Sequence, residues 1–444
     1  MKFLFKSFFL NNRFFLVGGG ILLVLVLSFP FKLLLPIGLT SILIFVLLVL
    51  FDTLVLYGPR ISVTASRLVS KVLSLGDDNP VKINVRNNSS VDLMITVIDE
   101  LPEQFQVRNF KWVRNLPANK SQEFEYPLKP VTRGEYVFGD LHCFIQTRLG
   151  LIKRRITVPL GGMIPVYPSI IQMKRFELKS FVRTSLEYGV KRMQRIGHSY
   201  EFEHIKHYVS GDDFRSINWK ATGRRAQLMV NQYEDEKSQQ VYCLLDRSRV
   251  MHMPFGGLSL LDYSVNASLV ISNIVLQKQD KAGLLTFSDR IGTAIKAERS
   301  KQQLKKILEA LYNEEEQPVE ANYELMYVGA RRFIKGRSLL FLFTNFESEY
   351  ALQRVIPQLR NLNRQHLLVV IFFENTEISD FTKQPTQTLE EVYTQVTAED
   401  HLYQKMQLVQ QLKQFGIMSI LTKPEQLTVN TINKYLELKS RGLI

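Results

Sequence analysis

Residues 240–248, Gln-Val-Tyr-Cys-Leu-Leu-Asp-Arg-Ser, decide the fold of the C-terminal part of this 444-residue chain. The five apolar residues 241–245 between polar neighbours predict a short strand that is buried on both faces, as in a parallel sheet. Further predicted strands lie at 283–287, 338–343, 366–373 and 418–421. Helical patterns lie between and after them, at 259–277, 301–312, 323–334, 350–362, 400–414 and 424–439. Alternating strands and helices predict an α/β domain over residues 237–444, with a parallel sheet covered on both faces.

Motifs of enzymatic sites are missing from the sequence. No Gly-x4-Gly-Lys-Ser/Thr follows a strand, and no Gly-x-Gly-x-x-Gly does so, which argues against the usual nucleotide sites. No Gly-x-Ser-x-Gly and no His-Glu-x-x-His occurs either. The two cysteines, Cys143 and Cys243, are too few for a disulfide scaffold, and Cys243 lies in the apolar strand as a core thiol. We therefore expect a protein that is not an enzyme.

The N-terminal region differs from the rest of the chain. Residues 14–51 contain a single charge, Lys32. A membrane span needs ~20 apolar residues, so this run suits two helices, predicted at 14–29 and 33–54, within a transmembrane hairpin over 14–56. The alternative is a cleaved signal peptide, but no small-residue cleavage site is present.

Basic residues flank the apolar run on its outer sides. They are Lys2, Lys6 and Arg13 before it, and Arg60, Arg67 and Lys71 after it. The positive-inside rule places both ends of the hairpin in the cytoplasm. We expect a cytoplasmic N-terminus at 1–13 and a soluble part that faces the cytoplasm.

Residues 57–165 show the period of β-strands. Val81–Val85 alternates apolar and polar residues, a turn cluster follows at 87–90, and Val91–Asp99 resumes the pattern, which predicts a hairpin. Shorter strands are predicted at 124–128, 136–138 and 141–147. Many short strands separated by turn signals predict a small β-sandwich.

Residues 166–236 form a basic connector between these two regions. Of the formal net charge of +14, residues 148–225 account for sixteen basic and six acidic residues. Helices are predicted within 173–193, and strands at 200–209 and 227–234. The basic region could contact anionic lipid headgroups or an acidic partner. Nucleic-acid binding is a further alternative, although no recognised nucleic-acid-binding motif accompanies the charge.

Three of the seven histidines, His198, His204 and His207, lie within ten residues of each other. A metal site is conceivable there. On a strand, however, His204 and His207 would point to opposite faces. We therefore favour surface or hydrogen-bonding histidines.

The most specific stretch is 208–225, Tyr-Val-Ser-Gly-Asp-Asp-Phe-Arg-Ser-Ile-Asn-Trp-Lys-Ala-Thr-Gly-Arg-Arg. Gly211 suits a turn, Asp212 and Asp213 can cap a short helix, and Arg215 could pair with one of these carboxylates. Trp219 is expected to anchor the segment in an apolar pocket. The stretch is either a clasp between two domains, which we favour, or a docking surface for an acidic partner.

A set of short segments carries a family resemblance: Tyr200–Glu203, residues 211–213, Arg215, Ile217–Lys220, Tyr233-Glu234 and Leu245–Ser248. In these segments the chain resembles the domain of unknown function 58 family. The resemblance implies a bacterial, inner-membrane protein with a von Willebrand factor A-like, Rossmannoid parallel-sheet domain. It also implies a MoxR-type AAA ATPase as partner, in assembly or stress response. The motif residues expected to contact a partner or another domain are Gly211, Asp212, Asp213, Arg215, Asn218, Trp219 and Lys220.

The same resemblance implies a metal-ion-dependent adhesion site after the strand at 241–245. Asp246 and Ser248 match its first two positions, whereas the third falls on Val250, which has no ligating atom. The later Thr position falls near Asn322, and the later Asp falls on Asn345. We expect a degenerate Mg²⁺ site at Asp246, Ser248 and Asn345, and no other cofactor.

We therefore interpret the chain as a membrane-anchored scaffold or adaptor that binds protein clients through its von Willebrand A-like domain. Two alternatives remain: a divalent-metal-dependent ligand-binding protein that uses the partial adhesion site, and a nucleic-acid-binding membrane protein.

Overall fold

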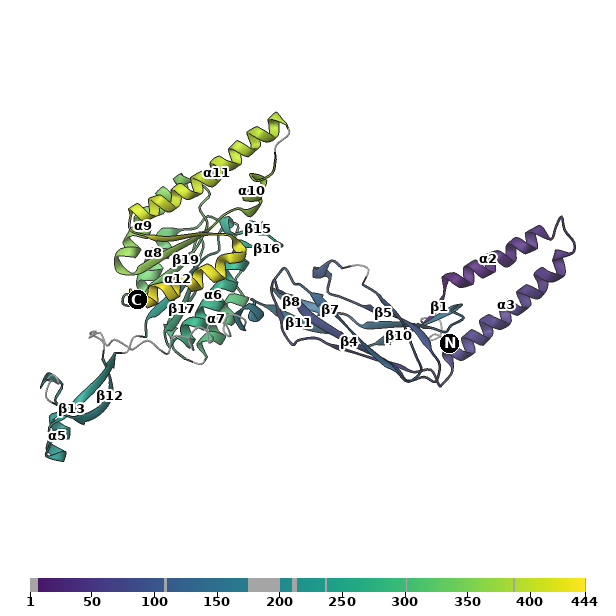
Figure 1. Ribbon diagram of the computed structural model, residues 1–444, viewed down its shortest axis with the longest axis horizontal. Coiled ribbons are helices and arrows are strands. Elements are labelled where there is room, and N and C mark those ends of the chain that lie inside the picture. Colours follow the sequence, from purple (N-terminus) through teal and green to yellow (C-terminus); the bar gives the residue numbers. More distant parts are fainter. Residues whose placement is uncertain are drawn as a thin grey trace. The chain divides into compact units, whose positions relative to one another are not determined.

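The computed structural model describes residues 7–107, 110–174, 200–209, 214–235, 238–300, 302–385 and 388–443. The chain forms two compact units, residues 1–170 and 171–444. Figure 1 shows the helices and strands of each.

Two apolar helices begin the first unit, α2 (Asn12–Leu27) and α3 (Leu34–Tyr57). They lie side by side, with the rings of Phe14 and Phe45 5.1 Å apart. Gly38 permits this approach, because a Cβ there would lie 2.5 Å from Leu25. With 24 residues, α3 is long and apolar enough to cross a membrane, whereas α2 has 16 residues.

A buried carboxylate joins α3 to the strands that follow. Asp52 is fully buried and accepts hydrogen bonds from the backbone N–H groups of Leu151 and Ile152, both at 3.1 Å. The hydroxyl of Thr147 donates to the same carboxylate. Arg154 donates to the carbonyl of Leu56 at 3.0 Å. Because fixed donors satisfy both oxygens of this buried carboxyl group, α3 is held firmly on the β module.

Three sheets form the β module. One has the order β1-β10-β9-β5-β6, the second β2-β4-β7, and the third β3-β11-β8. The strands are β1 (Phe8–Leu10), β2 (Val63–Leu68), β3 (Leu73–Ser74), β4 (Asn79–Asn87), β5 (Leu93–Asp99), β6 (Trp112–Leu116), β7 (Ser121–Leu128), β8 (Gly134–Phe138), β9 (Leu141–Gln146), β10 (Ile152–Val158) and β11 (Gly162–Tyr167). A short 3-10 helix, η1 (Glu103–Phe105), follows β5.

The predicted hairpin between 81–85 and 91–99 is wrong. Both stretches are strands, but β4 pairs with β2 and β7, whereas β5 pairs with β9 and β6. The turn cluster carries the chain from one sheet to another. Asn87 holds this crossover, since its amide donates to the carbonyls of Val91 and Leu116. Each strand buries its alternate side chains, a pattern that is the same for a hairpin and for a crossover.

The second unit contains an antiparallel hairpin of β12 (Tyr200–His207) and β13 (Met229–Asp235). This confirms the strands predicted at 200–209 and 227–234. The helices predicted within 173–193 fall mostly outside the described residues. Between the two strands lie η2 (Phe214–Ser216) and the short helix α5 (Trp219–Arg225).

A six-stranded sheet is the centre of the α/β domain, with the order β18-β17-β14-β19-β20-β21. The strands are β14 (Gln240–Asp246), β17 (Lys281–Phe287), β18 (Ile291–Glu298), β19 (Leu339–Phe343), β20 (Leu367–Phe373) and β21 (Met418–Thr422). Five strands are parallel, as predicted, but the edge strand β18 is antiparallel to β17 and was not predicted. Its side chains are only partly buried, so it lacks the apolar run of the central strands.

Helices cover both faces of this sheet (Figure 1). Val241, Cys243 and Leu245 of β14 pack in one core with α6 (Leu260–Gln277), α7 (Gln303–Tyr312) and α12 (Leu427–Ser440). Tyr242 and Leu244 pack in the other core with α8 (Tyr323–Phe333), α9 (Glu349–Gln365) and α11 (Leu389–Gln414). Successive residues of a strand point to opposite faces, which is why the run at 241–245 is apolar throughout.

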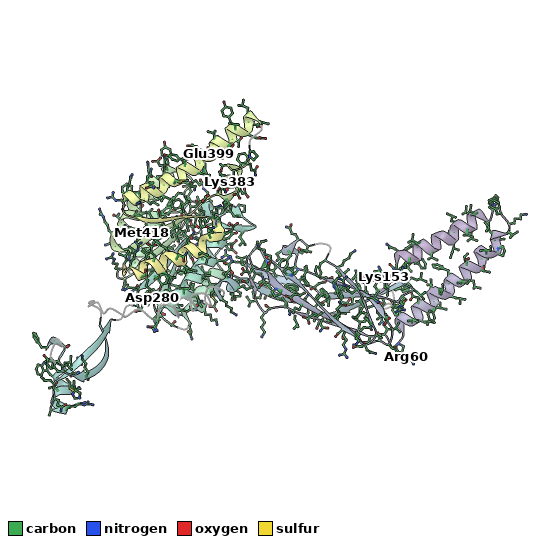
Figure 2. The ribbon with its side chains drawn as sticks, in the orientation of Figure 1. Arg60, Lys153, Asp280, Lys383, Glu399 and Met418 are labelled. Atoms are coloured by element: carbon green, nitrogen blue, oxygen red, sulfur yellow. The ribbon has the colours of Figure 1, made fainter. Side chains whose placement is uncertain are left out.

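The remaining elements are short: η3 (Arg249–Met251), β15 (Pro254–Phe255), β16 (Leu258–Ser259), α10 (Thr376–Phe381) and η4 (Pro424–Gln426). The helix predicted from 400 begins at 389, where Thr388 and Glu391 form a capping box. Asp280, labelled in Figure 2, holds the last helix: Tyr435 and Lys439 of α12 each contact its carboxylate at 2.5 Å.

Candidate functional site

The strand order of the α/β sheet reverses between β14 and β19. Numbered along the chain within the sheet, the order is 3-2-1-4-5-6, with β14 first and β19 fourth. In such sheets the chain leaves these two neighbouring strands toward opposite faces, and ligands bind in the crevice outside their carboxyl ends. The residues that follow these two strands therefore form the candidate site.

A buried hub of Asp246, Tyr323 and Thr344 lies at this point. Asp246 ends β14 and is fully buried. Its carboxylate accepts a hydrogen bond from the Thr344 hydroxyl at 2.7 Å and a longer one from the Tyr323 hydroxyl at 3.3 Å. The backbone N–H of Ser248 donates to its other oxygen at 2.9 Å. The hub thus fixes the ends of β14 and β19 and the start of α8.

Burial dominates the ionisation of the hub. It raises the pKa of Asp246 above the ordinary range, although the hydrogen bonds from Ser248, Thr344 and Tyr323 oppose this shift. Burial and the neighbouring Asp246 carboxylate hold the pKa of Tyr323 well above its usual value. Tyr323 therefore remains a protonated hydrogen-bond donor.

Beside the hub, Asn345 contacts a buried lysine. Lys405 of α11 donates to the side-chain oxygen of Asn345 at 3.2 Å and also to the carbonyl of Phe346. Burial lowers the pKa of Lys405 to about 8. A cationic group thus already occupies one side of Asn345.

These contacts fit a divalent cation poorly. The carboxylate of Asp246 accepts three protein donors, and Asn345 faces an ammonium group. Asn322, near the expected Thr position, instead caps α8 by accepting from Leu325 N at 3.0 Å. A cation would have to displace these donors, and the degenerate Mg²⁺ site remains a prediction.

The metal site considered at the three histidines gains no geometric support. Within the described part of the chain, no group of three or more His, Cys, Asp or Glu side chains is placed to hold a metal ion. His198 lies outside the described residues, and His207 is an exposed residue at the end of β12.

An open cleft of about 470 Å³ lies next to the hub, and we call it the strand-end cleft. Ser248 and Asn345 line it, whereas Asp246 does not. Its charged lining residues are Asp289, Glu320, Glu324, Glu347, Arg249 and Arg354, and its amides are Asn322, Asn345 and Gln358. The lining also includes apolar groups such as Val250 and Ala351. The sequence reasoning missed the residues from α8, α9 and the connecting loops, which no local motif marks.

An acidic loop supports one wall of the strand-end cleft. Glu314 is buried and forms an ion pair with Arg247 at 2.8 Å. Thr286, in β17, donates to the other oxygen of Glu314 at 3.0 Å. The N–H of Gln317 donates to the carbonyl of Arg247 at 2.7 Å. These contacts hold the chain that leads to Glu320 beside the end of β14.

The family motif around residue 218 is a clasp within the β12–β13 hairpin. The N–H of Asn218 donates to the carbonyl of Met229 at 2.8 Å, and its amide donates to Asn231 at 2.8 Å. The Asn218 side chain also accepts from Ala221 N at 3.0 Å and so caps α5. Thr222 accepts from Met229 N at 3.0 Å. The motif therefore holds α5 against β13.

The prediction that Trp219 anchors the motif in an apolar pocket is wrong. Trp219 is exposed, and so is Lys220 beside it. Asn218 makes the clasp through backbone and amide contacts, which leaves the indole free to point outward from the first turn of α5. Gly211, Asp212 and Asp213, together with the side chain of Arg215, lie outside the described residues.

Comparison with known proteins supports the resemblance stated from the motif. Residues 204–380 match the family described as Protein of unknown function DUF58. The chain is also 30% identical over 213 residues to a Bacillus subtilis (strain 168) protein named Uncharacterized protein YeaD, which covers 45% of this chain. The chain spans about half the length of this curated relative, 51%. The resemblance to the family is confirmed.

Solved structures provide only distant likenesses. The CARDB domain of a Pyrococcus furiosus protein covers 24% of this chain and 90% of its own, at 11% identity and a TM-score of 0.18. Proximal thread matrix protein 1 from the mussel byssus covers 43% of this chain and 42% of its own, at 10% identity and a TM-score of 0.23. Likenesses at these TM-scores carry no weight in assigning the fold or the function.

Proposed function

We propose that this chain, whose residues 204–380 carry the DUF58 family match, is a membrane-anchored adaptor that binds protein partners through its strand-end cleft. The observation that carries the proposal is the cleft itself, at the switch point of a doubly wound sheet. Its lining mixes four carboxylates, two guanidinium groups, three amides and apolar side chains. A polypeptide offers matching charges and apolar groups over such a surface, whereas a phosphate or a metal ion would use only one kind of contact.

The α/β domain is von Willebrand A-like in this proposal. Two observations support the assignment: the strand order with an antiparallel edge, and the position of Asp246 and Ser248 directly after the first strand. The domain is then an adhesion-type module that has lost its metal cage, in which Thr344, Tyr323 and Lys405 provide the donors around the carboxylate and the amide. No catalytic step is part of the proposal.

The anchor is the α2–α3 pair, which we place across the bacterial inner membrane with both ends in the cytoplasm. The composition and length of α3 support this placement, as do Arg13 and Arg60 near the two outer ends of the pair. The Asp52 joint makes the anchor part of the β module, so that the module projects from the membrane in a fixed direction.

The resemblance implies a MoxR-type AAA ATPase as one partner, and the experiment tests the cleft and this partner together. A photo-crosslinking residue replaces Ala351 in the strand-end cleft, and a matched control replaces Val328, an exposed residue of α8 outside the cleft lining. We expect an AAA ATPase to be crosslinked in cells from position 351 and not from 328. Failure to recover any AAA ATPase would remove this partner, and equal crosslinking from both positions would remove the cleft as its site.

The metal-dependent alternative is tested with membranes from the same cells. Crosslinking from position 351 is repeated in solubilised membranes with Mg²⁺ or with a chelator. We expect equal yields, because protein donors already engage the oxygens of Asp246 and Asn345. Loss of the product on chelation, together with loss in Asp246→Ala, would favour a metal-dependent binding protein.

A further inference from the structure

The tip of the β12–β13 hairpin exposes large apolar side chains. We define the hairpin tip as the described residues 208–209 and 214–228, because the ladder closes with His207 opposite Met229. Trp219 is 71% exposed, Phe214 70%, Val209 62% and Leu228 46%. Exposed apolar side chains that gather on one short segment mark an interaction surface, whereas scattered ones need no explanation.

The described residues of the hairpin tip are basic, whereas Asp212 and Asp213, which lie outside the described residues, lower the formal charge of 208–228 to +2. Between Phe214 and Leu228 there are four basic residues, Arg215, Lys220, Arg224 and Arg225, and no acidic residue. Lys220, Arg224 and Arg225 lie in α5 and are exposed. A cationic segment with exposed aromatic groups complements an anionic surface that also accepts apolar groups.

The tip is organised before it meets any ligand. Asn218 fixes α5 on β13, and Thr222 accepts from Met229 N. Tyr208 N donates to the Leu228 carbonyl at 2.9 Å, which closes the base of the tip. These hydrogen bonds hold α5 and the side chains that it exposes in place, so little conformational entropy is lost when they bind.

We propose that the hairpin tip docks into the interface of an anionic lipid bilayer, with Trp219 and Phe214 at the headgroup level and the basic residues on the phosphates. Trp is enriched at membrane interfaces, and basic residues near a membrane surface are attracted to anionic lipids. In Figure 1, α5 lies at the end of the hairpin, remote from the ends of its strands at 200 and 235. A protein partner would need a pocket of complementary shape to accept Trp219 and Phe214. A fluid lipid interface needs no such pocket.

The same chain contains an apolar helix that is able to cross a membrane. In an anchored chain, the hairpin tip would therefore bind a membrane that is already close to it. The effective concentration of lipid at the tip is then high. This inference is independent of the strand-end cleft and of any partner that the cleft binds.

Trp219 itself reports on the proposal. The chain has two tryptophans, and Trp112 stacks on Phe124 with ring centroids 4.3 Å apart, so Trp112→Phe keeps an aromatic ring there. The full-length Trp112→Phe chain is reconstituted into phosphatidylcholine vesicles with or without phosphatidylglycerol. We expect a blue shift of Trp219 emission in the vesicles that contain phosphatidylglycerol, and loss of intensity when brominated lipid is included. Raised salt should reduce both effects, because the attraction of exposed charges is screened.

Charge reversal provides the matched control. In the same background, Lys220→Glu, Arg224→Glu and Arg225→Glu together should abolish the blue shift and the quenching. Arg331→Glu with Arg332→Glu, an exposed basic pair at the end of α8, should preserve both. Emission from Trp219 that is the same with and without phosphatidylglycerol, and is not quenched by brominated lipid, would overturn the proposal. A blue shift that requires an added soluble protein would also overturn it, in favour of an acidic protein partner.

Discussion

Replacing Thr344 by valine removes one hydroxyl from the buried hub and preserves the shape of the side chain. The wild-type hydroxyl donates to Asp246 at 2.7 Å, and the second donor on that oxygen, Tyr323, is at 3.3 Å. Loss of this donor leaves a buried oxygen of Asp246 with only the longer bond from Tyr323, which costs about 1–3 kcal/mol, so we expect a loss of about 2 kcal/mol in the stability of the α/β domain. The same hydroxyl also lies 2.7 Å from the Tyr323 hydroxyl. Because no cavity forms, the loss reports on the hydrogen bonds of the Thr344 hydroxyl rather than on packing.

A thiol close to the hub provides the assay. Cys243 lies in β14, is fully buried, and burial raises its pKa to about 12, so it reacts only when the domain opens. Cys143→Ala removes the other thiol of the chain. When closing is fast, the labelling rate follows the population of the open state, and ~2 kcal/mol corresponds to roughly 30-fold faster labelling.

The control is Thr431→Val, an equal change at a buried threonine whose hydroxyl bonds only a helix carbonyl, that of Leu427 at 2.8 Å. This neutral bond is worth about 1 kcal/mol or less, so we expect at most about fivefold faster labelling. If Thr344→Val labels no faster than Thr431→Val, the hub does not hold the two strand ends together, and the reasoning is refuted.

Three further predictions follow from other buried contacts. Asp52→Ala leaves two buried N–H groups at 151–152 without an acceptor, so their amide hydrogen exchange in the solubilised chain should accelerate on the order of 100-fold; unchanged exchange would contradict the joint between helix and β module. Gly283→Ala places a Cβ 2.3 Å from the Tyr242 ring, and overpacking of about 1–3 kcal/mol should speed thiol labelling by roughly 5- to 150-fold; wild-type labelling would show that the ring can move aside. Burial lowers the pKa of Lys405 from 10.5 to about 8, so between these pH values the folded domain binds fewer protons than the unfolded chain. The free energy of unfolding should therefore rise with pH, by about 2 kcal/mol between pH 8 and 9.5. Urea titrations followed by thiol labelling, with each rate divided by that of the unfolded chain at the same pH, should show this rise in the wild type and not in Lys405→Met. An equal dependence of stability on pH in the two proteins would contradict the prediction.

Local patterns were sufficient for most of the α/β domain. The strands at 241–245 and 366–373 could be predicted because a strand buried on both faces needs an uninterrupted apolar run. The edge strand β18 was missed because one of its sides lies open and its residues are only partly buried. The start of α11 at Leu389 was missed, although its capping box, Thr388 with Glu391, was a readable signal.

Which strands pair with one another could not be predicted from local sequence patterns. The runs at 81–85 and 91–99 have equal alternation, and the turn cluster between them favours a hairpin locally. The structure pairs each with strands elsewhere in the chain, β4 with β2 and β7, and β5 with β6 and β9. Alternation specifies which side chains are buried, but it does not specify the neighbouring strand.

By itself, the sequence determined the apolar N-terminal region, the β and α/β character of the two following parts, and the location of the family motif. These features depend on hydrophobic periodicity and on short segments. Only the tertiary structure decided the partners of Asp52, Asp246 and Asn345, whose hydrogen bonds reach 95, 98 and 60 residues along the chain. It also decided that Trp219 lies outside any core, because whether an aromatic side chain is buried depends on what packs over it, and no nearby residue specifies that.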